Sequence, residues 1–151
     1  MRRASERLIS DVWANMKRLI AIALCALALA ACSEWSLDTY WKSAEYRLIA
    51  IDVRAQMCLI FEDDGVTLVG PTIFAVGSDT KHVVVKQHPA IDQWAGKIDR
   101  SITNYFVVER RTGTFADRKA GVRGPLKKEE FDHLAASLSL PPFTKTFDDL
   151  Q

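Results

Sequence analysis

Short apolar runs joined by brief links constrain the fold of this 151-residue chain more than any other sequence feature. Each run has the length of a strand, is rich in β-branched and aromatic residues, and ends at turn-forming residues. The runs span residues 46–53, 57–61, 72–76, 82–86 and 104–109, and residues 66–69 add a short sixth. Because a parallel return needs a crossover of a dozen residues or more, the short links predict antiparallel pairing.

Two of the links have the composition of tight turns. Asp63-Asp64-Gly65 predicts a hairpin because Asp and Gly tolerate positive φ, and Ser78-Asp79-Thr80 predicts a second turn. Two longer connections, residues 88–103 and 111–124, are polar or punctuated by Gly and Pro, and we expect them to be exposed loops.

Several of these runs are apolar on both alternating sets of positions. In residues 46–53, Leu48 and Ala50 belong to one set, and Ile49, Ile51 and Val53 belong to the other. A sheet with one face in water would alternate more cleanly, so both faces must be covered. The sheet must therefore curl toward a barrel, be covered by loops and the C-terminal tail, or meet a partner.

One helix is predicted near the C-terminus, over residues 127–138. Phe131, Leu134, Ala135 and Leu138 fall at positions i, i+3, i+4 and i+7 and form one apolar stripe. We expect Phe131 and Leu134 to be its buried anchors. The predicted fold is therefore α+β: a single antiparallel, curled sheet of five to six strands with one C-terminal helix.

The N-terminal region has the features of an export signal. Met16-Lys17-Arg18 is basic, and residues 19–31 carry no charge. At about 1.5 Å per residue this run is too short to cross a hydrocarbon core of about 30 Å, which favours a cleavable signal peptide over a membrane span. A buried core helix is the alternative. Residues 1–15 do not fit the signal, which a true start at Met16 or a long basic region would explain.

The end of the uncharged run resembles the lipobox of bacterial prolipoproteins. Leu29, Ala30, Ala31 and Cys32 supply its aliphatic residue, its two small residues and its cysteine, whereas the bulky Leu24 before Cys25 does not fit. In that motif the thiol receives a diacylglycerol, and the peptidase needs small side chains before the bond that it cuts. The resemblance implies that Cys32 is lipidated and holds the protein on a membrane.

The predicted domain organisation follows from this cleavage. Residues 1–31 are the signal, residues 32–43 a lipidated tether, and residues 44–151 a β-rich globular domain. Ser33 resembles the residue that directs lipoproteins of Gram-negative bacteria to the outer membrane, so we expect the domain to face the periplasm. The aromatic residues of the tether either fold back over the core or rest at the lipid headgroups; they are Trp35, Tyr40 and Trp41.

The sequence predicts no catalytic, cofactor-binding or metal-binding residue. It contains no phosphate loop, nucleophile elbow or zinc-binding helix motif. Cys58 lies in an apolar run, as is typical of a buried, inert thiol, and the three histidines, His82, His88 and His133, lack close metal-ligand spacing. Lys86-Gln87-His88 is the densest polar group beside an apolar run and is the first place to look for a site.

The charge of the mature chain bears on its partners. Residues 32–151 carry 15 basic and 17 acidic residues. Binding to nucleic acid depends on an excess of basic residues that neutralise phosphates, so nucleic acid is not an expected partner.

Residues 46–147 resemble an uncharacterised family of small bacterial lipoproteins and secreted domains. The segments that carry the resemblance are residues 69–77, 86–89 and 104–108, Gly124-Pro125-Leu126 and Glu129-Glu130-Phe131. The resemblance implies one antiparallel β domain with a late helix and assigns no active site.

Together these features predict an envelope lipoprotein with a non-catalytic binding or structural domain. Its expected partners are the membrane, through the lipid on Cys32, and an unidentified envelope protein. The alternative is a periplasmic inhibitor or immunity protein that blocks a toxin or a hydrolase. An enzyme is the least expected of the three classes.

Overall fold

The computed structural model describes residues 38–92 and 95–151. These residues belong to one compact unit, Leu37–Gln151, which has its own hydrophobic core. The predicted export signal and the lipobox, with Cys32, lie outside the described residues. Within them, no helix combines the length and apolar composition that crossing a membrane requires.

The first four strands form an antiparallel sheet in the order β1-β2-β3-β4. They are β1 (Asp38–Ser43), β2 (Tyr46–Ala50), β3 (Cys58–Phe61) and β4 (Thr67–Val69), with a short 3-10 helix, η1 (Arg54–Gln56), between β2 and β3. The predicted turn joins β3 to β4, and Gly65 adopts a φ of +64° there, which glycine does without steric cost.

A second antiparallel sheet has five strands in the order β10-β9-β6-β5-β11. They are β5 (Ile73–Ser78), β6 (His82–Gln87), β9 (Asn104–Glu109), β10 (Val122–Leu126) and β11 (Lys145–Thr146). A separate two-stranded hairpin, β7 (Ala90–Asp92) and β8 (Lys97–Ile98), extends from the loop after β6.

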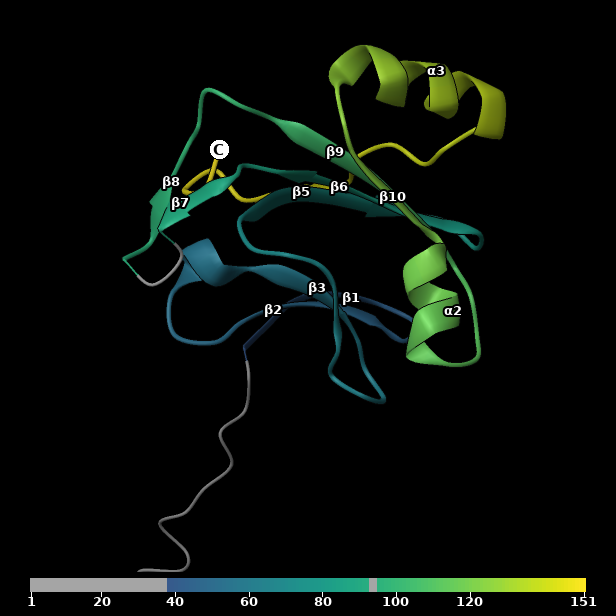
Figure 1. The fold of residues 1–151 in the computed structure, drawn as a ribbon, viewed down its shortest axis with the longest axis horizontal. Coiled ribbons are helices and arrows are strands. Elements are labelled where there is room, and N and C mark those ends of the chain that lie inside the picture. Colours follow the sequence, from purple (N-terminus) through teal and green to yellow (C-terminus); the bar gives the residue numbers. More distant parts are fainter. Residues whose placement is uncertain (1–37, 93–94) are drawn as a thin grey trace, which may run out of the picture. The chain divides into compact units, whose positions relative to one another are not determined.

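The two larger sheets pack face to face around the main core (Figure 1). Leu48 and Leu59 from the four-stranded sheet share one hydrophobic cluster with Val76 and Val83 from the five-stranded sheet. The antiparallel pairing is confirmed, but the prediction of a single sheet is wrong. The break at residues 70–72 ends the pairing after β4 and lets the chain cross to the second sheet at β5.

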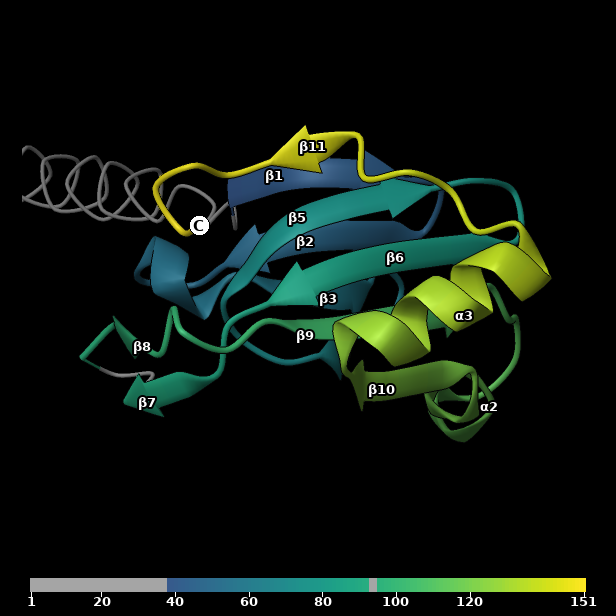
Figure 2. The ribbon, with the colours of Figure 1, turned by 90° about the horizontal axis from the view of Figure 1, so that it is seen from above.

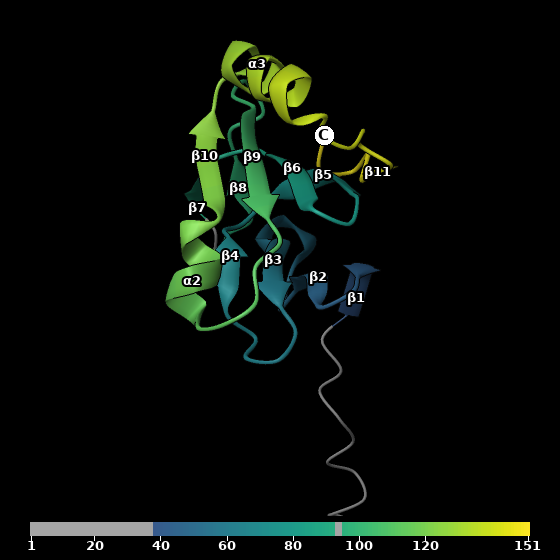
Figure 3. The same ribbon diagram turned by 90° about the vertical axis from the view of Figure 1, so that its right-hand side faces the viewer.

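The helix α3 (Lys128–Leu138) covers the opposite face of the five-stranded sheet, so the domain has three layers (Figure 3). Phe131 is buried there, with its ring centroid 5.0 Å from Tyr105 and 5.5 Å from Phe143. The predicted helix is confirmed, but Leu134 is only half-buried and does not belong to this cluster. Ala135, the next residue of the apolar stripe, packs against this cluster instead.

Three regions that were expected to be irregular are ordered. Asp38–Ser43 is strand β1 and not part of a tether, and its Tyr40 and Trp41 pack against the main core. The loop 88–103 contains the β7–β8 hairpin, and the loop 111–124 contains α2 (Phe115–Ala120). Thr114 caps α2 in a reciprocal pair with Asp117, which satisfies two backbone N–H groups at the start of the helix.

Replacing Phe131 with alanine tests the packing of α3. Phe131→Ala should lower the free energy of unfolding by about 3–5 kcal/mol, because a large buried ring is lost and a cavity remains. Such a loss is a large share of the roughly 5–15 kcal/mol that stabilises a typical domain. Urea melts of Leu37–Gln151 would measure it.

The matched control is Glu129→Ala, on the exposed side of the same helix. It should change stability by less than about 0.5 kcal/mol. Glu130 is a poorer control, because its carboxylate accepts a hydrogen bond from the Lys127 backbone N–H at 2.7 Å and caps the helix. Equal shifts of the urea midpoint in both variants would contradict the assigned packing.

Candidate functional site

The outer face of the four-stranded sheet carries an apolar surface separate from the main core. Leu48 and Ala50 of β2 face the core, whereas Ile49 faces outward, as the alternation of a strand requires. Ile49 pairs with Cys58 of β3 and forms a cluster with Cys58 and Ile60. Among the described residues, no other buried or half-buried hydrophobic side chain joins this cluster. No described helix belongs to this cluster as α3 belongs to the cluster on the five-stranded sheet, although its three side chains are only 5–8% exposed.

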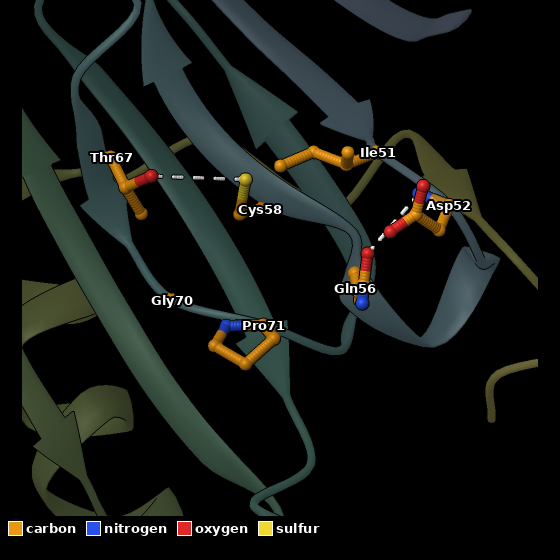
Figure 4. A pocket seen from close by; sticks show the side chains of 7 residues that line it. All are labelled: Ile51, Asp52, Gln56, Cys58, Thr67, Gly70 and Pro71. Carbon is orange, nitrogen blue, oxygen red and sulfur yellow. Dashed lines mark hydrogen bonds between the residues drawn. The ribbon is translucent and has the colours of Figure 1, made fainter. Parts of the chain in front are cut away.

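A pocket of about 400 Å³ lies on this outer face, from the end of β2 across β3 to β4 (Figure 4). Its volume falls in the range of small-molecule sites, about 300–1,000 Å³. Most of its lining is apolar, and the side chain of Ile51 points toward Cys58. The lining residues are Ile51, Asp52, Gln56, Cys58, Thr67, Gly70 and Pro71.

The pocket lies at the end of the domain where the described chain begins, which we call the chain-entry end. Asp38, the first residue of β1, pairs with Ala50, the residue directly before Ile51. The β7–β8 hairpin, η1 and the C-terminus lie at the same end, and α2 lies at the other (Figure 2). The chain therefore enters the sheet beside the mouth of the pocket.

One wall of the pocket is held by a strained residue. Thr72 follows the lining residue Pro71 and has a φ of +69°, a conformation that β-branched residues rarely adopt. The Thr72 hydroxyl donates to the carbonyl of Ala55 at 2.8 Å, and the Thr72 carbonyl accepts from the N–H of His88 at 3.1 Å. Strain of this kind persists only where the surroundings enforce it, and it is frequent at ligand-binding sites.

Gln87 fixes the same wall from the second sheet. Its amide nitrogen donates to the carbonyls of Gly70 and Pro71 at 3.2 and 2.8 Å, and its amide oxygen accepts from Asn104 at 3.3 Å. The segment 70–72 is therefore tied both to the five-stranded sheet and to η1. These hydrogen bonds fix the position of this wall of the pocket.

The lining of the pocket includes one thiol, Cys58, and one carboxyl group, Asp52. Burial raises the pKa of the Cys58 thiol above its usual value, and a weak hydrogen bond from the Thr67 hydroxyl, at 4.0 Å, opposes this only in part. A raised pKa keeps the thiol protonated and unreactive. The expectation of a buried thiol is confirmed, because Cys58 is free and buried.

The far end of the outer face is charged. Glu62 makes ion pairs with Lys42, at 2.7 Å, and with Arg47. All three side chains are partly exposed, so these pairs contribute little to stability. They end the apolar strip that runs from Ile51 through Ile49 and Cys58 to Ile60.

The polar group Lys86-Gln87-His88 does not form a reactive cluster. Lys86 lies over the rings of Tyr105 and Phe143, on the side of α3, while Gln87 supports the pocket wall. His88 is buried, stacks on Phe74 with ring centroids 4.2 Å apart, and pairs its Nδ1 with the carbonyl of Ile102 at 2.6 Å. The three side chains therefore make their contacts in different parts of the domain.

The three histidines lie apart in the structure. His82 lines a smaller cavity of about 160 Å³ with Glu109 and Arg123, and His133 is exposed on α3. Within residues 38–92 and 95–151, no group of three His, Cys, Asp or Glu side chains could hold a metal ion.

The sequence did not predict the pocket, although it predicted the apolar outer face on which the pocket lies. The second apolar set of residues 46–53 marked an outer face that needs cover. It could not show that Gly70 and Pro71 would close one side, because their position depends on hydrogen bonds from Gln87, sixteen or more residues away.

Comparisons with known proteins identify no relative. No protein-family model matches the chain, and no curated protein or solved structure is significantly similar to it. The resemblance to a family of small lipoproteins therefore stays a prediction.

The reactivity of Cys58 tests the chemistry of the pocket. In Leu37–Gln151, where Cys58 is the only thiol, alkylation by iodoacetamide at pH 8 should be at least about tenfold slower in the folded than in the urea-unfolded state. Since burial raises the thiol pKa, the rate for the folded domain should rise at a higher pH than the rate for the unfolded chain. Rates measured by mass spectrometry would check both points.

Thr67→Val provides the control. It removes the hydroxyl that partly lowers the Cys58 pKa, so it should not accelerate alkylation. A folded domain that reacts as fast as the unfolded chain would show that Cys58 is accessible and ionised.

Proposed function

We propose that this chain is a lipid-anchored protein of the bacterial cell envelope, whose β domain is a non-catalytic binding module. The anchor is the lipid on Cys32, and the membrane is the outer membrane, with the domain facing the periplasm. The observation that carries the binding role is the mostly apolar pocket on the outer face of the four-stranded sheet.

The sequence supports the anchor. Leu29-Ala30-Ala31-Cys32 follows a basic start and an uncharged run too short to span a bilayer. Strand β1 begins at Asp38, six residues after Cys32, so the anchor would hold the domain close to the membrane surface. Two or more acyl chains suffice for stable attachment.

The character of the pocket supports binding without catalysis. A catalytic thiol needs a lowered pKa, usually from a nearby base or cation, whereas the pKa of Cys58 is raised. Asp52 is exposed, and its backbone N–H donates to the Gln56 side chain at 3.1 Å. These groups suit a site that recognises an apolar ligand.

Cys32→Ser in the full chain tests the anchor. The variant should lose acylation and remain an uncleaved precursor, because the lipoprotein peptidase acts on the lipidated cysteine. Metabolic labelling with radioactive palmitate and the size of the protein on a gel would measure both effects. Cys25→Ser is the matched control and should be labelled and processed normally. Labelling of Cys32→Ser at the wild-type level would refute the anchor.

A second candidate is an inhibitor or immunity protein that blocks a toxin or hydrolase in the periplasm. It is favoured by exposed aliphatic side chains on the segments around η1 and the β7–β8 hairpin, which lie at the chain-entry end of the domain. They are Ile51, Val53, Ile91 and Ile102. Exposed apolar patches of this kind are common at protein–protein interfaces.

The paired substitution Ile91→Asp and Ile102→Asp tests this alternative. It should abolish retention of a periplasmic partner in a crosslinked pull-down, because charged side chains would be buried at the interface. Phe115→Asp, at the opposite end of the domain, is the control for an exposed aromatic residue. If the wild-type domain itself retains no envelope protein, the inhibitor role fails.

A further inference from the structure

We propose that the pocket on the outer face of the four-stranded sheet binds a small organic amine, with the apolar body of the ligand in the pocket and its ammonium group beside Asp52. The inference rests on the binding role proposed for this pocket, and it names the chemical class of the ligand. The ligand is a free small molecule that is apolar at one end and positively charged at the other.

The volume of the pocket limits the size of the ligand. The pocket measures about 400 Å³. Since a water-sized group occupies about 30 Å³ in a liquid, about 13 such groups would fill it. This is the size of a small molecule and not that of a folded partner.

The lining of the pocket suits an apolar body. Ile51 follows β2, Cys58 lies on β3 and Pro71 follows β4, so apolar groups from three segments surround the same space (Figure 4). The buried, protonated thiol of Cys58 behaves as a small apolar group. Ile51 is 62% exposed, so a ligand that covers it removes apolar surface from water, which favours binding.

One end of the pocket is negatively charged. Among the described residues that line the pocket, Asp52 is the only one with a charged side chain. The amide oxygen of Gln56 adds a partial negative charge beside it, because this oxygen accepts from the Asp52 backbone N–H at 3.1 Å. Figure 4 shows both residues at the end of the pocket opposite Thr67. An ammonium group has three N–H donors and can donate to oxygen atoms grouped in this way.

The charge of Asp52 is not neutralised by a basic side chain. In the described part of the chain, no ion pair includes Asp52. Arg54, the basic residue nearest to it in the sequence, pairs with Asp149 at 2.8 Å. The Arg54 guanidinium group also lies over the rings of Tyr40 and Phe147, at 4.9 and 5.6 Å. Arg54 is therefore engaged with β1 and the C-terminal tail, and a cationic ligand meets the Asp52 carboxylate without competition from it.

Asp52 contributes selectivity more than affinity. Its side chain is exposed, so water and salt screen its interaction with a ligand charge. We therefore expect an amine to bind about two- to fivefold more tightly than a neutral molecule of the same shape. A carboxylate of that shape should bind more weakly than the neutral molecule, because like charges repel.

The first experiment compares three ligands of matched shape: phenylbutylamine, phenylbutanol and phenylbutanoate. They are titrated into Leu37–Gln151, the compact unit with its own core, and binding is followed by amide NMR. We expect affinity to fall in that order, with the largest shifts at Asp52, Gln56 and Thr67. Equal binding of the amine and the alcohol would overturn the proposed amine but leave the pocket as an apolar site. Binding of none of the three would refute the binding role of the pocket as well.

Asp52→Asn tests the role of the charge. The exchange keeps the shape of an exposed side chain, so the variant should fold. It should bind phenylbutylamine about two- to fivefold more weakly and phenylbutanol unchanged. Glu129→Gln is the matched control, because it removes one exposed negative charge from α3, in another layer of the domain. Equal losses of amine binding in both variants would overturn the role of Asp52.

Gly70→Leu tests the place of binding. A Cβ at Gly70 would meet no atom within 4 Å, so the leucine side chain enters open space at the pocket and the variant should fold. It should weaken binding of the amine and of the alcohol alike, by at least about tenfold. Unchanged binding of both ligands to a folded Gly70→Leu domain would place the site elsewhere and overturn the proposal.

Discussion

The packing of the four-stranded sheet on the five-stranded sheet determines the rest of the structure. One set of side chains from each sheet, among them Leu48, Leu59, Val76 and Val83, forms the main core. Burial of apolar surface between the sheets is the principal favourable contribution to folding. Because side chains alternate along a strand, burying one set in this core turns the other set to the outside. Each sheet is left with a second apolar face.

The outer faces of the two sheets differ in the elements that pack against them. On the five-stranded sheet, Val84, Tyr105 and Val107 are covered by α3 through Phe131. On the four-stranded sheet, Ile49, Cys58 and Ile60 form a cluster that gains no helix from the described part of the chain. A helix of eleven residues covers one face only. The asymmetry leaves an apolar surface on the side of the domain where the chain enters.

The same crossing that creates the two sheets also shapes the pocket. Residues 70–72 leave β4 and pass to β5, and Thr72 adopts its unusual φ at this point. Hydrogen bonds from Thr72 to Ala55 and from Gln87 to Pro71 hold the crossing in place. Contacts with η1 and with the five-stranded sheet therefore hold the strained residue, and the wall of the pocket beside it, in place.

The sequence by itself determined the local elements. β-Branched runs, turn residues and the apolar spacing around Phe131 specified the antiparallel strands and the helix α3, because these patterns depend on neighbours in the chain. It also determined that residues 46–53 have two apolar sets, and it predicts a lipobox that ends at Cys32. Only the tertiary structure decided that the strands divide into two sheets and that Tyr40 and Trp41 pack against the core through β1. It also decided that Phe131, and not Leu134, anchors α3. These outcomes, and the pocket beside Cys58, depend on contacts between segments that are distant in the sequence, such as the hydrogen bond from Gln87 to Pro71. The periodicity of apolar residues along the chain does not predict such contacts.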